Sequence, residues 1–412
     1  MTCDVCLLSH PYHRGGVTRW MADAFSSWNS EDVNAALITV KPIRKFISSG
    51  DRPLLLDLLN EKFNNLVYTS DVSFRFELGS IAFRASIYRK TILEHVPPGT
   101  PIIPSDDEAC WLAASSVAKR NPFYPVIHSH GDNEYYRLLK VYQNSISGII
   151  AVSKKVRERI CQEIHLFPLD RILVNPCGLF VQDFKTHSYQ RSDTVVWIGR
   201  MEEKSKRVSD IPKILEILRH SPRHINFLII GDGEKFAYLK KFIDGFKVEN
   251  LSVELLGWLN NVQIKEILRT SKVLIQTSNY EGMSLTVMEA LSSGCSAVSS
   301  RVSGVEDFEQ VKESENILFL YEIGDVINAA GFITNALNSH NLRTAKESEK
   351  FAAKYFDIAY RNVLLMQFFD RLSKKNAEMS EISIPYYKIL MSTFLASLRL
   401  LKFKMLRILR QP

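Results

Sequence analysis

The sequence has few cysteines, and their positions do not suggest a disulfide framework. Six cysteines are scattered over 412 residues, which is typical of a protein from a reducing compartment. Cys3 and Cys6 form a C-x-x-C pair, but a zinc site would need a second pair or nearby histidines, and none follows. Both cysteines lie in Thr2–Leu8, which reads as a buried strand, where positions three apart point to opposite faces. We therefore favour a structural role for this pair over a redox or metal role.

Long apolar runs and targeting patterns are also missing. No run of 18 apolar residues occurs, so the sequence predicts no ordinary transmembrane helix. The first residues show no basic stretch followed by an apolar one, so we expect no signal peptide and a cytoplasmic protein. Hydrophobic residues make up 46% of the chain and charged residues 24%, which indicates a globular protein with a full core.

Acidic residues are absent from the C-terminal end of the chain. The net charge is +7, and residues 382–412 carry six basic residues and no acidic one, so the rest is nearly neutral. A nucleic-acid-binding protein more often carries such charge on a folded face, so we expect no nucleic-acid partner. Apolar residues recur here at spacings of three and four, as in one stripe of a helix. Residues 388–410 therefore predict a basic amphipathic helix on an anionic membrane surface; packing on the N-terminal domain or on a partner chain is the alternative.

Short apolar runs alternate with longer amphipathic segments along the chain, which is typical of α/β domains with parallel sheets. The expected strands of the first half are Asp4–Ser9, Ala36–Val40, Pro101–Pro104, Pro125–His128, Gly148–Val152 and Leu173–Asn175. After Pro176-Cys177-Gly178 the pattern restarts, with strands expected at Thr194–Ile198, Ile225–Ile230, Leu251–Leu256, Val273–Gln276 and Ser296–Ser299. Residues 348–371 read as one long terminal helix. Two such domains place a ligand cleft at the carboxyl ends of their strands.

The segment from Ser278 to Ala290 is the most informative part of the sequence. An apolar strand runs into a loop, and a helix begins near Ser284. Free N–H groups at a helix start form an anion site, and Gly282 lets the backbone approach a phosphate closely. Glu281 lies just before the helix and Glu289 inside it, so the two carboxylates can accept hydrogen bonds from sugar hydroxyls. Spacing alone is equally consistent with a turn glutamate and a solvated helix glutamate.

This segment resembles the signature of glycosyltransferase family 4, the retaining GT-B enzymes. The eight-residue spacing of Glu281 and Glu289, the Tyr280-Glu281-Gly282 sequence and the small residues after Glu289 carry the resemblance. It implies that Glu281 contacts the donor sugar and Glu289 the ribose. It also implies that backbone amides at Met283, Ser284 and Leu285 bind the diphosphate.

Other elements of that family follow in the expected order. Trp197-Ile198-Gly199-Arg200 and Lys206 resemble the pair of cations that neutralises the diphosphate leaving group, a task for which cations are suited. Lys204 competes with Lys206 because the spacing is one residue longer than usual, but Arg207-Val208 favours Lys206. Gly231 and Gly257 lie in glycine turns that resemble strand ends of the family's donor domain. Each glycine turn is a weak signal when taken alone.

The first half carries the acceptor-side elements of the resemblance. Gly15 and Gly16 resemble the loop that opens the family's first long helix, and His130 resembles a histidine at a strand end that lines the sugar pocket. A structural histidine is about as consistent with the sequence. Asp106 and Asp107 depart from the family pattern; one of them either helps the acceptor hydroxyl to lose its proton or caps the next helix, and we favour the cap.

Together these observations predict an α/β protein with the GT-B fold, two doubly wound Rossmann-like domains with a cleft between them and a helical tail. The expected domains are an acceptor-side domain at 1–180, a donor domain at 181–350, a terminal helix at 351–378 that crosses back to the first domain, and a basic tail at 379–412. The predicted activity is metal-independent retaining transfer, without a cofactor, from a nucleotide-diphosphate sugar to a glycan or lipid-linked glycan in polysaccharide biosynthesis, at the cytoplasmic face of a membrane. The alternatives are a nucleotide-sugar epimerase, a phosphorylase, and a non-catalytic binding protein or partner subunit.

Overall fold

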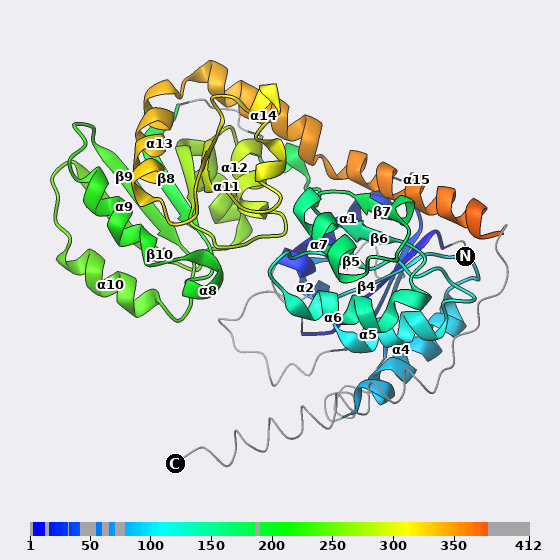
Figure 1. Cartoon of the computed structure of the whole chain (residues 1–412). Helices are drawn as coiled ribbons and strands as arrows, with labels where there is room; N and C mark the ends of the chain where they lie inside the picture. The colour runs from blue at the N-terminus through cyan, green and yellow to red at the C-terminus, as the bar shows by residue number, and fades with distance from the viewer. Residues whose placement is uncertain are drawn as a thin grey trace, which may run out of the picture.

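The chain forms two α/β domains joined by helices that run from one to the other (Figure 1). The computed structural model describes residues 3–12, 16–31, 33–41, 55–59, 66–70, 79–185 and 190–377. Gly15 and the basic tail at 388–410 lie outside the described residues, so the predictions made for them rest on sequence alone.

The first domain is built on parallel strands, with helices between them. Its strands are β1 (Val5–Leu8), β2 (Ala35–Val40), β3 (Val67–Ser70), β4 (Ile102–Pro104), β5 (Val126–Ile127), β6 (Ile149–Ala151) and β7 (Ile172–Val174). Its helices are α1 (Gly16–Ser30), α2 (Leu55–Leu58), α4 (Ile81–His95), α5 (Glu108–Ser116), α6 (Asn133–Tyr142) and α7 (Lys154–Glu163). The strands pair in the orders β3-β2-β1-β4 and β5-β6-β7, and a parallel bridge between Ile102 and Phe123 connects the two groups.

The second domain contains a six-stranded parallel sheet in the order β10-β9-β8-β11-β12-β13. The strands are β8 (Ser192–Ile198), β9 (Ile225–Ile230), β10 (Leu251–Gly257), β11 (Ser271–Gln276), β12 (Ser296–Ser300) and β13 (Leu318–Tyr321). The helices are α8 (Glu203–Lys206), α9 (Asp210–Leu218), α10 (Phe236–Gly245), α11 (Asn261–Thr270), α12 (Leu285–Ser292), α13 (Val326–Ser339) and α14 (Leu342–Phe356). The strand order reverses between β8 and β11, so ligands of such a sheet bind beside the loops that follow these two strands.

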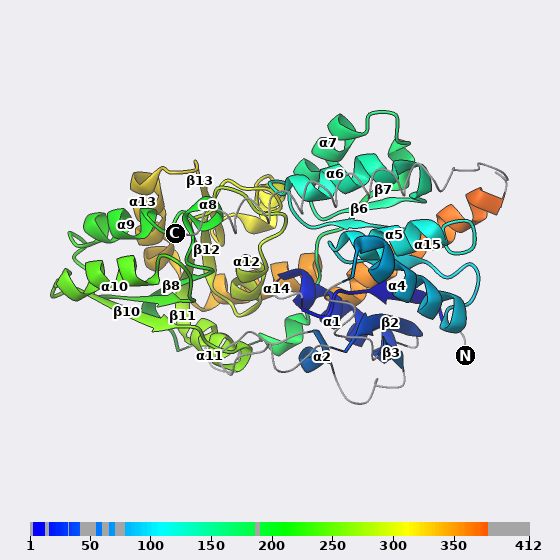
Figure 2. The ribbon, with the colours of Figure 1, turned by 90° about the horizontal axis from the view of Figure 1, so that it is seen from below.

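The C-terminal helices contact both domains. Helix α14 packs in the second domain, where Phe351 and Phe356 are buried, and α15 (Ile358–Ala377) packs against the first, where Phe368 and Leu372 belong to its core. Figure 2 shows α14 beside α12, and α15 lying along the first domain. Second-domain packing begins at Leu179, just before the predicted boundary at 180.

The prediction of one helix over residues 348–371 is wrong. The chain leaves the helical conformation at Asp357, which has φ −60° and ψ 125°. Here it pairs with the linker: the Leu179 N–H donates to Phe356 O at 2.9 Å, and the Ile358 N–H donates to Leu179 O at 3.1 Å. The chain passes between the domains near Leu179 and again near Asp357. The pairing of these two segments overrides the helical pattern, which continues on both sides of Asp357.

Candidate functional site at the domain boundary

The loop between β11 and α12 is hydrogen-bonded to helix α8. The Thr277 hydroxyl donates to Lys206 O at 2.8 Å and accepts from the Trp197 indole N–H at 2.9 Å. The backbone N–H of Asn279 donates to Ser205 O at 2.8 Å. These bonds hold the loops that follow β8 and β11 together, at the point where the strand order reverses.

An ion pair between Lys206 and Glu281 lies in these loops. The Lys206 Nζ is 2.5 Å from Glu281 Oε1, with 20% and 16% of the two side chains exposed, and the Ser278 hydroxyl donates to the same oxygen at 2.8 Å. Lys204 is exposed, and its carbonyl accepts from the Asn279 side chain at 3.0 Å. The structure therefore brings Lys206, and not Lys204, to Glu281.

Arg200 follows β8 and is more open to solvent. Its side chain is 54% exposed and lies 3.6 Å from Glu202. The Arg200 charge also interacts with Tyr280, which precedes Glu281. Lys206 thus pairs with Glu281 directly, while the Arg200 charge reaches the neighbouring Tyr280.

The start of α12 presents backbone N–H groups at the boundary between the domains. Ser284 caps the helix, and its hydroxyl accepts from Val287 N–H at 3.4 Å. Among the described residues, the N–H groups of Met283, Ser284 and Leu285 have no hydrogen-bond acceptor. The Met283 and Leu285 side chains pack against the cores of both domains. An anion held by these amides would also gain from the helix dipole.

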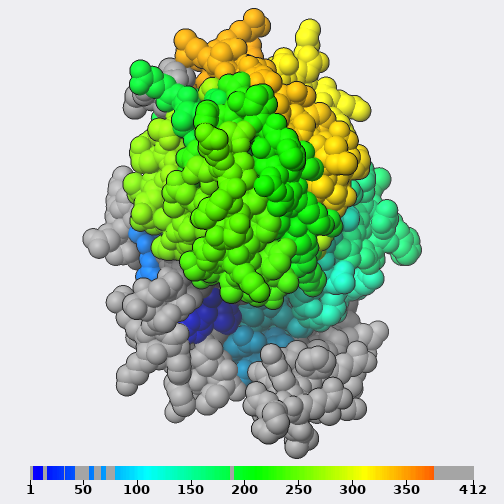
Figure 3. Space-filling view, turned by 90° about the vertical axis from the view of Figure 1, so that its left-hand side faces the viewer, coloured from blue at the N-terminus to red at the C-terminus, as the bar shows by residue number. Residues whose placement is uncertain are grey.

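Gly282 and Gly131 let the two domains approach closely. A Cβ atom on Gly282 would lie 1.7 Å from the carbonyl oxygen of His128. A Cβ atom on Gly131 would lie 2.6 Å from the Tyr280 ring. The prediction for Gly282 was close approach to a phosphate, and the structure shows a close approach to the first domain. In Figure 3 the second domain, in green, adjoins blue and teal atoms of the first.

Further contacts across the boundary join α7 to the segment after β12. The Ser153 and Ser303 hydroxyls are 2.6 Å apart and buried, and Asp307 accepts a hydrogen bond from the backbone N–H of Lys154 at 2.8 Å. Lys155 lies 3.2 Å from Glu306. The Asp307 carboxylate therefore binds the start of a helix that belongs to the other domain.

Glu289 lies one turn inside α12. Burial raises the pKa of its carboxyl to about 7, and Arg19 and Lys265 oppose this rise while Asp23 adds to it. Arg19 and Asp23 belong to α1 of the first domain, so Glu289 faces charges across the boundary. Arg19 was not among the predicted site residues.

His130 and His128 lie in different surroundings. The His130 carbonyl accepts a hydrogen bond from Arg159. Burial, with Lys155 and Arg159, lowers the pKa of its ring. The His128 ring packs edge-on against Trp20, with centroids 4.8 Å apart, and burial lowers its pKa to about 4. His128 was not among the predicted site residues, although its place directly after β5 was a usable signal.

The predicted cap on α5 is not formed. Asp107 occupies the N-cap position, but its side chain accepts no hydrogen bond from the helix. Its carboxylate instead lies 3.5 Å from Arg84, because Arg84 of the neighbouring helix α4 reaches the same strand end. The charge of Asp106 interacts with the His128 ring. These carboxylates therefore lie among cationic or ionisable side chains at the carboxyl ends of β4 and β5.

Glycines at the ends of β8, β9 and β10 pack against one another. A Cβ atom on Gly231, which has φ +135°, would lie 1.9 Å from Gly199 O. The Gly231 N–H donates to Gly257 O at 2.7 Å. Gly257 has φ +70°, a region that favours glycine. Gly16 of the first domain lies instead against α12, where an added Cβ would be 3.6 Å from Leu285 Cδ1.

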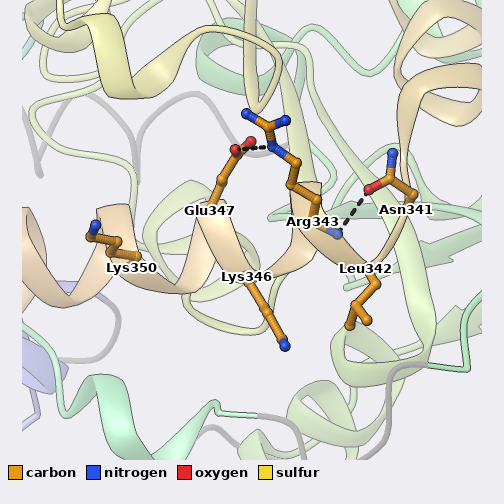
Figure 4. A pocket seen from close by; sticks show the side chains of 6 residues that line it. All are labelled: Asn341, Leu342, Arg343, Lys346, Glu347 and Lys350. Atoms are coloured by element: carbon orange, nitrogen blue, oxygen red, sulfur yellow. Dashed lines mark hydrogen bonds and ion pairs between the residues drawn. The ribbon is translucent and has the colours of Figure 1, made fainter.

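Within the described parts of the chain, no three His, Cys, Asp or Glu side chains are grouped as a metal site. The helices described there include none with the length and apolarity to cross a bilayer. A hollow of about 560 Å³ lies along the surface of α14, and Arg343 and Glu347 are among the residues that line it (Figure 4). None of its lining residues belongs to the loops around Glu281, so we place the candidate site at the boundary on chemical grounds.

The family model described as glycosyl transferases group 1 matches residues 181–351. The match covers most of the second domain, which is therefore similar in sequence to group 1 glycosyl transferases. This domain contains Arg200, Lys206, Glu281 and Glu289. His130, Gly16 and Arg19 come from the first domain and lie outside the match.

Two curated proteins show more distant similarity. The phosphatidylinositol N-acetylglucosaminyltransferase GPI3 subunit of Saccharomyces cerevisiae is 25% identical over 240 residues, or 55% of this chain and 52% of that protein. The Campylobacter jejuni GalNAc-alpha-(1->4)-GalNAc-alpha-(1->3)-diNAcBac-PP-undecaprenol alpha-1,4-N-acetyl-D-galactosaminyltransferase is 26% identical over 250 residues, or 57% of this chain and 65% of that protein. The matches thus span about half of the yeast protein and less than two thirds of the bacterial one.

Solved structures share the fold of the whole chain. The crystal structure of Anabaena Alr3699/HepE in complex with UDP has a TM-score of 0.68 and 16% sequence identity, covering 89% of this chain and 100% of that one. At this identity the similarity establishes the fold alone. The predicted GT-B fold around the group 1 domain is confirmed.

Proposed function

We propose that this protein is a retaining glycosyltransferase that uses a uridine-diphosphate sugar as donor and needs no metal ion. The observation that carries the proposal is the Lys206–Glu281 ion pair at 2.5 Å, directly before the α12 amides. This arrangement offers one carboxylate, one ammonium group and a helix start to a ligand that carries both hydroxyls and phosphates. Uridine is chosen because the Anabaena structure contains UDP.

In the proposed reaction, the bond between the anomeric carbon and the diphosphate oxygen breaks, and its electron pair leaves with the diphosphate. The acceptor oxygen bonds to the same face of that carbon, and the hydroxyl proton passes to the diphosphate. Arg200, Lys206 and the amides of Met283–Leu285 stabilise the growing negative charge. Glu281 binds the donor sugar and Glu289 the ribose, while His130 lines the sugar pocket.

The proposed acceptor is a glycan or a lipid-linked glycan. The yeast relative is named for a phosphatidylinositol acceptor and the Campylobacter relative for an undecaprenol-linked one. The six basic residues at 382–412 would hold the protein at an anionic membrane surface, where each contributes about 1 kcal/mol. This proposal places the protein at the cytoplasmic face of a membrane, in glycan or polysaccharide biosynthesis.

The proposed function is tested by assaying release of nucleoside diphosphate from a panel of UDP-, GDP-, ADP- and dTDP-sugars, with and without a lipid-linked acceptor and with EDTA. Lys206→Ala should lower turnover by about 10²–10³-fold, the usual effect of removing a group that stabilises developing charge. Lys204→Ala is the matched control, because it removes an exposed lysine two residues away on the same helix.

Equal turnover in the two lysine variants would remove Lys206 from the mechanism. Binding of a donor without any turnover would favour a non-catalytic subunit, and product formation without an acceptor would favour an epimerase. Wild-type protein that neither binds nor turns over any donor would refute the proposal. The anomeric configuration of the product, read by NMR, separates retention from inversion.

A further inference from the structure

Helices α1 and α12 meet at the domain boundary. A Cβ atom on Gly16, at the start of α1, would contact Leu285 of α12 at 3.6 Å, and Leu285 packs against the cores of both domains. Arg19 lies about one turn along α1 from Gly16, and Glu289 lies one turn along α12 from Leu285. Residues three or four apart share a helix face. Arg19 therefore lies on the same face of α1 as Gly16, and Glu289 lies on the same face of α12 as Leu285.

Five charged residues gather at this place, and we call them the boundary cluster: Arg19, Asp23, Asp183, Lys265 and Glu289. Arg19 Nε donates to Asp23 Oδ2 at 2.7 Å, and only 23% and 14% of these side chains are exposed. Lys265 of α11 lies 2.9 Å from Asp183 of the linker. The Arg19 charge interacts with both Asp183 and Glu289. The cluster therefore contains groups from α1, the linker, α11 and α12.

Asp23 holds the Arg19 guanidinium, and Asp183 holds Lys265. In the described part of the chain the Glu289 side chain makes no such hydrogen bond or ion pair of its own. Glu289 is thus a partly desolvated carboxylate whose ionised form depends on cations that are bound to other residues. Burial and Asp23 disfavour that form, while Arg19 and Lys265 favour it.

We propose, resting on the proposed function, that Arg19 is a positioning residue for the donor site. It reaches across the domain boundary and favours the ionised form of Glu289, the form that accepts the ribose hydroxyls. The first domain thereby completes a donor site whose other groups come from the second. An ionised carboxylate accepts hydrogen bonds from two hydroxyls, whereas a protonated one must use an oxygen as a donor. Loss of the facing guanidinium would leave the Glu289 carboxyl protonated at neutral pH.

The test measures the affinity of the full chain for UDP by titration calorimetry from pH 6 to pH 9. If Arg19→Gln raises the pKa of Glu289 from about 7 by about one unit, the ionised fraction at pH 7 and the affinity should fall about fivefold. The two affinities should converge at pH 9, where Glu289 is ionised in both proteins. A merely structural defect in α1 would weaken binding at every pH, so the convergence separates the two causes.

Three further variants complete the experiment. Arg19→Lys should restore most of the affinity at pH 7, because it keeps the charge. Glu289→Gln shows how much of the pH dependence of UDP affinity comes from UDP itself and from other groups. Adding Arg19→Gln to this variant should cause no further loss of affinity. Arg343→Gln is the matched control, because Arg343 forms the same type of pair four residues from Glu347, at 2.8 Å, on the exposed surface of α14 (Figure 4).

The possible results separate this inference from the proposed function. Wild-type protein that binds no UDP at any pH would overturn both the proposed donor site and the role of Arg19. Wild-type binding with an unchanged Arg19→Gln profile, or an equal loss in the Glu289→Gln background, would overturn only the role of Arg19. Loss confined to neutral pH, rescued by lysine and absent in the Glu289→Gln background, is the expected result.

Discussion

Replacing Glu289 with glutamine should stabilise the protein, and only at neutral and alkaline pH. Burial raises the pKa of Glu289 from its ordinary value of 4.5 to about 7. Below pH 4.5 this carboxyl is protonated in both the folded and the unfolded chain, so it does not disfavour folding. Between pH 4.5 and 7 the unfolded chain loses the proton while the folded chain keeps it, and stability falls. Glutamine does not titrate, so the variant avoids this loss.

The size of the effect follows from the difference between the two pKa values. A shift of about 2.5 units corresponds to about 3 kcal/mol at full burial. The Glu289 side chain is only partly buried, so we expect about 2 kcal/mol above pH 7. For a domain of this size, that difference raises the melting temperature by roughly 4–8 °C. If Glu289 binds the donor as proposed, the wild-type carboxylate reduces stability in exchange for binding.

The assay is thermal unfolding of wild-type and Glu289→Gln protein at pH 5 and pH 8, without ligand. The difference in melting temperature should be small at pH 5 and several degrees in favour of the variant at pH 8. Glu216→Gln is the control, because Glu216 is 46% exposed and pairs with Arg219 on the surface of the same domain. A variant that is less stable at pH 8, or a difference that is the same at both pH values, would refute the reasoning.

Three other changes test the domain boundary and the terminal helix. Gly282→Ala should push the two domains apart and so abolish transfer activity, because the added methyl group would lie 1.7 Å from His128 O. An unchanged radius of gyration, measured by small-angle scattering, would contradict this separation. Ser303→Ala removes a 2.6 Å hydrogen bond to Ser153 and should cost about 1 kcal/mol in urea denaturation, whereas no loss would show that the contact is not formed in solution. Phe368→Ala should lower the free energy of unfolding by about 3–5 kcal/mol, because this side chain is only 3% exposed. Calorimetry should show the first domain melting at a lower temperature, and an unchanged transition would show that α15 does not pack there.

Local patterns in the sequence were sufficient to predict most strands and the loop between β11 and α12. The strand predicted at Ile225–Ile230, for example, coincides with β9. Apolar periodicity and capping residues act over a few positions, so they can be read directly from the chain. The start of α12 was predictable for the same reason, because Ser284 caps it and a strand precedes it.

Contacts between distant segments could not be predicted in this way. The break at Asp357 depends on backbone hydrogen bonds to Leu179, far away in the sequence. The local signal is Asp357 itself, whose carboxylate caps α15 by accepting from the Ala359 N–H at 3.0 Å. Arg19 follows Gly16 in the stretch that resembles the opening of the family's first long helix, but that resemblance assigned it no role. It lies 270 positions before Glu289 in the sequence, so only the folded chain shows that the two charges interact.

Gly282 has a structural role that the sequence did not predict. The sequence explains this glycine by a bound phosphate, while the structure places it against the His128 carbonyl of the other domain. Both contacts require a residue without a Cβ atom, and they lie beside the same loop. The loop that would hold the diphosphate is therefore also the loop on which the domains meet. If ligand binding and domain contact share this loop, they are thermodynamically coupled, and a change to either must alter the other.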